Sequence, residues 1–125
     1  MLKGGGAYIW KNYLPEDNEY QSTFKEYTVP SYIMLVNWTN QGILNVKESP
    51  QRLDTFKKAV EAVGGKVTGF YLTMGRYDLV VVVEFPSDEA ATTVILKIAS
   101  LGQVHTETLK AFPEEQYRDI IAKVQ

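Results

Sequence analysis

The stretch that decides the fold is residues 70–85, which read FYLTMGRYDLVVVVEF. Two runs rich in β-branched and aromatic residues flank a connection that contains Gly75, and this pattern predicts a β-hairpin. The second run is apolar at consecutive positions, so both faces of that strand are expected to be buried. The hairpin therefore predicts a strand in the centre of a sheet.

The segments on either side of the hairpin supply the other elements. Residues 32–38, YIMLVNW, are also apolar at consecutive positions and predict a second central strand. Ser49-Pro50 is a good helix start, and Gly64-Gly65 ends that helix. The two strands of the hairpin are expected over residues 66–74 and 78–85. After them we expect a helix from residue 86 to 102, an edge strand over 104–109 and a last helix over 114–124. The order is βαββαβ plus a C-terminal helix, which predicts a ferredoxin-like α+β fold with an antiparallel sheet of order 4-1-3-2.

The domain is expected to run from residue 30 to residue 125. Residues 1–29 contain a triple glycine and scattered aromatic residues without a lasting periodicity. One interpretation is a poorly ordered extension. The alternative is a misannotated start, because Lys25-Glu26 can be encoded as AAG-GAG, a bacterial ribosome-binding sequence, and Val29 as a GTG start codon.

Composition excludes several classes of function. The formal net charge is −2 with acidic and basic residues interspersed, so no basic stripe suits a nucleic acid. No run is long and apolar enough to span a membrane. Cysteine is absent, which excludes disulfides and thiolate chemistry. A single histidine cannot form the usual His-rich metal site. We expect a cytoplasmic protein with no metal and no cofactor.

Alternation along the strands assigns the two faces of the predicted sheet. The face toward the helices is expected to hold Leu79, Val81, Val83, Phe85, Phe70, Leu72, Met74, Ile33 and Leu35. The other face, called the open face below, is expected to show Val80, Val82, Glu84, Tyr71, Thr73, Tyr32, Met34, Val36 and Trp38. So apolar a face predicts a homodimer in which two sheets pack against each other. The alternative is a monomer whose C-terminal helix folds back over that face.

The turn of the hairpin carries a family resemblance. Gly75-Arg76-Tyr77-Asp78, between the two strand-like runs, resembles the Gly-x-Tyr-Asp signature of the GYD domain family. Further matching segments are residues 32–39, 49–54, 64–66 and 106–109. The resemblance covers residues 30–124 and implies a dimeric α/β barrel, but no established biochemical function. A more distant likeness is to the ligand-sensing domain of Lrp/AsnC regulators, which binds small effectors between subunits. The helix-turn-helix of those regulators is not found in this sequence.

The candidate ligand-binding residues are expected to frame a pocket at a subunit interface. They are Tyr71, Arg76, Tyr77, Asp78, Glu84 and His105. The structural alternative is that Gly75 supplies a turn conformation and that Asp78 bonds amides of the same turn. No catalytic set is predicted, so the expected function is a homodimeric small-molecule-binding or interaction module. By fold analogy alone, the alternative is a dimeric-barrel monooxygenase or haem-degrading-type enzyme that uses Asn37, Trp38 or His105.

Overall fold

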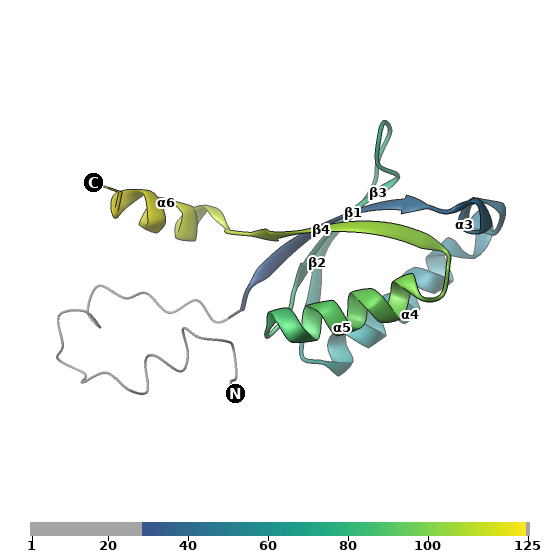
Figure 1. The fold of residues 1–125 in the computed structure, drawn as a ribbon, viewed down its shortest axis with the longest axis horizontal. Helices are drawn as coiled ribbons and strands as arrows, with labels where there is room; N and C mark the ends of the chain where they lie inside the picture. The colour runs from purple at the N-terminus through teal and green to yellow at the C-terminus, as the bar shows by residue number, and fades with distance from the viewer. Residues whose placement is uncertain (1–28, 125) are drawn as a thin grey trace.

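The computed structural model describes residues 29–124, so the extension expected over residues 1–29 lies almost wholly outside the described part. The elements, in chain order, are β1 (Ser31–Trp38), α3 (Asn40–Leu44), η1 (Val46–Glu48), α4 (Ser49–Ala62), β2 (Lys66–Leu72), β3 (Leu79–Glu84), α5 (Asp88–Ala99), β4 (Val104–Ala111) and α6 (Glu114–Ala122). The strands form an antiparallel sheet of order β2-β3-β1-β4, which confirms the predicted 4-1-3-2 topology and the ferredoxin-like fold. Helices α4 and α5 lie side by side on one face of this sheet (Figure 1).

The faces of β3 are as predicted, and they build the core. Val81, Val83 and Phe85 are buried against the helices, with Val60 of α4 and Val94 of α5 among their neighbours. Val80 and Val82 are half-buried on the open face. Alternation was a safe guide here because the two faces of β3 differ in their apolar content.

The face assignment of β1 was wrong. Residues paired across neighbouring strands point to the same side of a sheet. Met34 pairs with Val81 and is buried, whereas Leu35 pairs with Val80 and is half-buried on the open face. The side chains of β1 that face the helices are therefore Tyr32, Met34, Val36 and Trp38. Only the register with β3 decides this, because β1 is apolar on both faces.

Two side chains near the turn of the hairpin are exposed, although they were predicted to face the helices. Phe70 packs against the core as predicted, but Leu72 is 72% and Met74 100% exposed. Strand β2 ends at Leu72, and the segment that joins it to β3 projects past the end of the sheet (Figure 1). Leu72 and Met74, which alternation had assigned to the helix side, therefore stay in solvent.

The C-terminal helix does not fold back over the open face. Helix α6 continues beyond the end of β4, away from α4 and α5 (Figure 1). The side chains expected to form its apolar side are between 42% and 70% exposed, namely Tyr117, Ile120, Ile121 and Val124. The structure therefore leaves the open face uncovered by α6.

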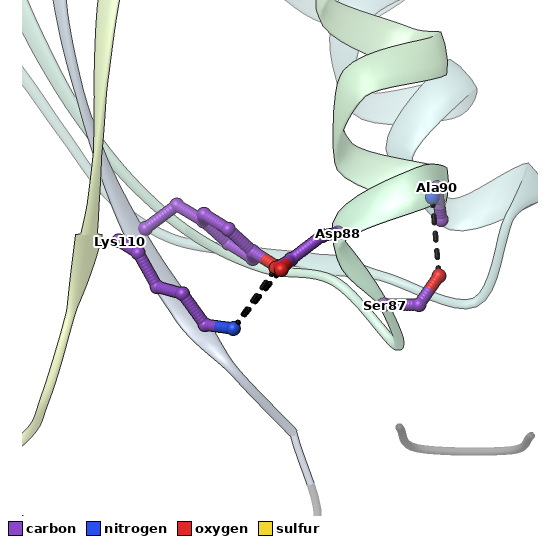
Figure 2. A network of polar contacts seen from close by, with 5 residues as sticks. Ser87, Asp88, Ala90 and Lys110 are labelled. Atoms are coloured by element: carbon purple, nitrogen blue, oxygen red, sulfur yellow. Dashed lines mark hydrogen bonds and ion pairs between the residues drawn. The ribbon is translucent and has the colours of Figure 1, made fainter. Parts of the chain in front are cut away.

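A polar network ties the start of α5 to the sheet. Ser87 caps the helix, accepting from the Ala90 backbone N–H at 3.1 Å, and Lys110 of β4 forms an ion pair with Asp88 at 3.1 Å (Figure 2). The buried Tyr32 hydroxyl donates to the same carboxylate. This hydrogen bond and then Lys110 hold the pKa of Asp88 below its ordinary value of 3.8. Burial and then the Asp88 bond raise the pKa of Tyr32 well above 10.0.

Replacing Tyr32 by phenylalanine is expected to lower the free energy of unfolding by about 1 kcal/mol at neutral pH, since Asp88 is largely exposed and water replaces part of the bond. A lowered carboxyl pKa stabilises the fold above 3.8, and this contribution is lost as the pH falls through the lower folded value. A raised phenol pKa stabilises below 10.0, and this contribution is lost as the pH rises through the folded value. In urea unfolding, the difference in free energy of unfolding between wild type and Tyr32→Phe should therefore shrink at both low and high pH. Tyr71→Phe, at a 60% exposed tyrosine, is the control, and a pH-independent difference would contradict the assignment.

Candidate functional site

The turn segment, residues 73–78, is fastened to the end of β1. The Asp78 backbone N–H donates to the carbonyl of Val36 at 2.9 Å and to Oδ1 of Asn37 at 3.1 Å. Its carboxylate Oδ2 accepts from the backbone N–H of Trp38 at 3.0 Å. The expectation that Asp78 bonds amides of its own turn was wrong, because the start of β3 lies beside the end of β1. Gly75 has φ = +122°, which confirms its role as a turn residue.

The side chain of Tyr77 reaches from the turn segment across the open face. Its hydroxyl donates to Oε1 of Glu107 at 3.0 Å, and Glu107 lies on β4 opposite Leu35. The guanidinium carbon of Arg76 stands 5.5 Å from the centroid of the Tyr77 ring, within reach of a cation–π contact. The turn thus adds a polar rim beside the apolar centre of the open face.

The structure brings together most of the predicted site residues, but not Glu84. Tyr71, Val80, Leu35 and Glu107 pair in one row across the sheet, and Tyr77 reaches this row. The exposed His105 pairs with Asn37, whose side chain contacts Asp78, so it belongs to the same end of the open face.

Glu84 lies at the other end of β3, paired with Ser31 and Lys66. It lies five strand positions from Leu79, which is about 17 Å of extended strand. The rim at the turn therefore consists of Tyr71, Arg76, Tyr77, Asp78 and His105, together with Glu107. Within residues 29–124, no group of three or more His, Cys, Asp or Glu residues is arranged to hold a metal ion.

The three residues of the enzyme alternative do not converge. Asn37 and His105 pair on the open face, whereas Trp38 pairs with Val104 toward the helices. One strand position separates Asn37 from Trp38, and this is enough to send their side chains to opposite sides of the sheet. The structure therefore does not assemble a pocket from these three side chains.

A cavity of about 210 Å³ lies on the other side of the sheet, between the strands and helices α4 and α5. Its wall is mostly apolar, and the polar residues that contribute to it are Ser49, Arg52, Thr55, Gln103 and Thr106. Trp38 belongs to this wall, although the alternation of β1 had placed it on the open face. No motif marked Gln103, so the sequence offered no signal for this site.

Two residues that line the cavity each have a buried polar side-chain atom without a hydrogen-bond partner. The atoms are Nε1 of Trp38 and Oε1 of Gln103. By contrast, Arg52 donates from Nη1 to the carbonyl of Asn45 at 3.0 Å and from Nη2 to that of Gly42 at 3.4 Å. Gly42 itself lies so close that an added Cβ would stand 2.0 Å from the Gln103 carbonyl oxygen. Helix α3 therefore packs directly on the cavity wall at this glycine.

Comparison with known proteins gives a consistent family assignment. Residues 32–121 match the family described as GYD domain. A relative from Thermus thermophilus is 32% identical over 98 residues, which are 78% of this chain and all of the relative. That relative is named a glutamine synthetase and cystathionine beta-lyase binding protein.

A solved structure supports the fold. The crystal structure of MtbAldR superposes with a TM-score of 0.54 at 13% identity, over 68% of this chain and 52% of the other. This chain spans about half the length of that protein, and the likeness concerns the fold alone. A crystal structure of a protein from Thermus thermophilus is 27% identical, with a TM-score of 0.44 over 66% of this chain and 92% of the other.

Proposed function

Because the chain belongs to the GYD domain family, we propose that it is a homodimeric, cytoplasmic binding module that holds its partners and does not transform them. The observation that carries this proposal is the apolar centre of the open face. Ile33, Leu35, Val80 and Val82 lie there on the two central strands and are half-buried. Both long helices pack on the opposite face (Figure 1), so a second molecule has access to these side chains.

A second copy of the chain fits this face. Two-fold pairing places each apolar centre on its equivalent and keeps the charged rim, with Arg76 and Glu107, at the margin. Full burial of an aliphatic side chain is worth about 1.5–3 kcal/mol, and these residues are already partly covered, so each gains less. The exposed apolar side of α6, which projects from β4, supplies further contact area.

The name of the Thermus relative suggests what the dimer binds. Since that protein is named for binding glutamine synthetase and cystathionine beta-lyase, we propose enzyme partners for this chain as well. In the dimer, Tyr71, Arg76, Tyr77, Asp78 and His105 form the proposed small-molecule rim, and Glu84 belongs to the opposite margin of the interface. Purified glutamine synthetase and cystathionine beta-lyase from the source organism would test partner binding by surface plasmon resonance, and absence of binding to both would contradict it.

Dimerisation is tested with Leu35→Lys. Wild-type protein is expected to show twice its 14.1 kDa mass in native mass spectrometry and in light scattering. The lysine faces Glu107 across the strand pair, which favours the folded monomer, but its charge is costly to bury in a dimer. The dimer dissociation constant should rise by about a hundredfold or more.

Leu96→Lys is the matched control, because Leu96 is 64% exposed on α5. It should leave the dimer intact, and circular dichroism should show both variants folded. A wild-type protein that is monomeric at every concentration, or a Leu35→Lys variant as dimeric as the control, would overturn the proposal.

A further inference from the structure

The cavity between the sheet and the helices lies wholly within one subunit and is separate from the rim on the open face. We propose that it is a binding site for a small neutral molecule made of one aromatic ring with a hydroxyl group, that is, a ligand of the phenol class. This inference names a second site and does not depend on dimerisation.

The size of the cavity sets the size of the ligand. A dry apolar cavity of about 150 Å³ in another protein holds one benzene molecule. The cavity here measures about 210 Å³ and opens to solvent on one side, so one six-membered ring with a small substituent fits inside it. Water beside the apolar inner wall finds few polar partners, so a ring that displaces it gains hydrophobic contact.

The residues that line the cavity favour a ligand with an apolar ring. Met34 and Val81 form its sheet side, Phe56 comes from α4 and Ile98 from α5. Phe70 and Trp38 add aromatic surfaces, against which a flat ring packs edge to face or with an offset. A ring in this position gains hydrophobic contact on both of its faces.

The two buried atoms without hydrogen-bond partners favour a hydroxyl group as the substituent of the ring. Trp38 Nε1 is a donor and Gln103 Oε1 an acceptor, and leaving each of them unsatisfied costs about 1–3 kcal/mol. A hydroxyl group accepts one hydrogen bond and donates another, so one phenol oxygen serves both groups after the two side chains turn toward it. A hydrocarbon ring of the same size leaves both unsatisfied.

The wall of the cavity disfavours an ionised ligand. Arg52 is the only ionisable side chain among the lining residues, and both of its terminal nitrogens already donate to backbone carbonyls. A carboxylate in this cavity would lose its hydration against a mostly apolar wall, and it would compete with two backbone carbonyls for the single guanidinium. The apolar wall therefore favours a neutral ligand over an ionised one.

The test is an NMR titration of the full chain with phenol, toluene and benzoate as probes. The indole N–H signal of Trp38 is identified by its loss in Trp38→Phe, which leaves that of Trp10. Phenol should move the Trp38 signal downfield in a saturable manner and bind about tenfold more tightly than toluene, as one added hydrogen bond predicts. Benzoate should bind more weakly than phenol. Equal binding of phenol and toluene, tighter binding of benzoate, or a response of Trp10 alone would overturn the proposal.

Two variants locate the site. Gln103→Leu should reduce the preference for phenol over toluene to about threefold or less while toluene still binds. Thr106→Phe should fill the cavity and abolish binding of both rings, and an unchanged phenol response in this folded variant would contradict the assignment. Leu35→Lys should bind phenol like wild type, so a failure of the dimer proposal and a failure of this one give different results.

Discussion

Replacing Phe85 by alanine is expected to lower the free energy of unfolding by about 3–5 kcal/mol. Phe85 is fully buried, and its ring meets that of Tyr32 edge to face, with centroids 5.7 Å apart and an interplanar angle of 68°. Alanine removes the transfer free energy of the ring and leaves a void under α4 and α5 that the close-packed core fills only partly. Since a domain of this size has a total stability of about 5–15 kcal/mol, the variant should be close to the limit of folding.

Phe112→Ala is the matched control for this measurement. The same substitution is made there at a ring that is 54% exposed just before α6. Its effect in urea unfolding should stay within about 0.5 kcal/mol. Similar losses in the two variants would show that Phe85 is not the centre of the core.

Replacing Asp78 by alanine is expected to cost about 2–3 kcal/mol, the second largest effect. The carboxylate accepts from the Trp38 N–H at 3.0 Å, and its loss leaves that donor at the end of β1 without this partner. Amide hydrogen exchange of Trp38 should accelerate together with that of the turn segment. Because Trp38 also lines the cavity, phenol binding should weaken in parallel.

Asp78→Asn distinguishes the hydrogen bond from the charge. The amide oxygen of asparagine can accept the same bond, so this variant should recover most of the lost stability. If Asn and Ala variants were equally destabilised, the negative charge and not the acceptor would be the contribution of Asp78. If both retained wild-type stability, its role would be confined to the proposed ligand rim.

The sequence by itself determined the fold. Consecutive β-branched and aromatic residues around Gly75 marked the hairpin, and the order of strand-like and helix-like segments left one right-handed arrangement with two central strands. The faces of β3 were also readable, because Leu79, Val81, Val83 and Phe85 form a more apolar set than Val80, Val82 and Glu84. Local propensity and period-two alternation are enough for such features.

Only the tertiary structure decided which side of β1 is buried, how Asp78 is bonded and where a cavity lies. Each depends on register: the pairing of Met34 with Val81 sends Trp38 to the helix side, and the same pairing brings Asp78 beside the end of β1. Gln103 enters the wall through packing with residues that are distant in the chain. A strand that is apolar on both faces carries no signal of its orientation, because alternation is informative only where the two faces differ.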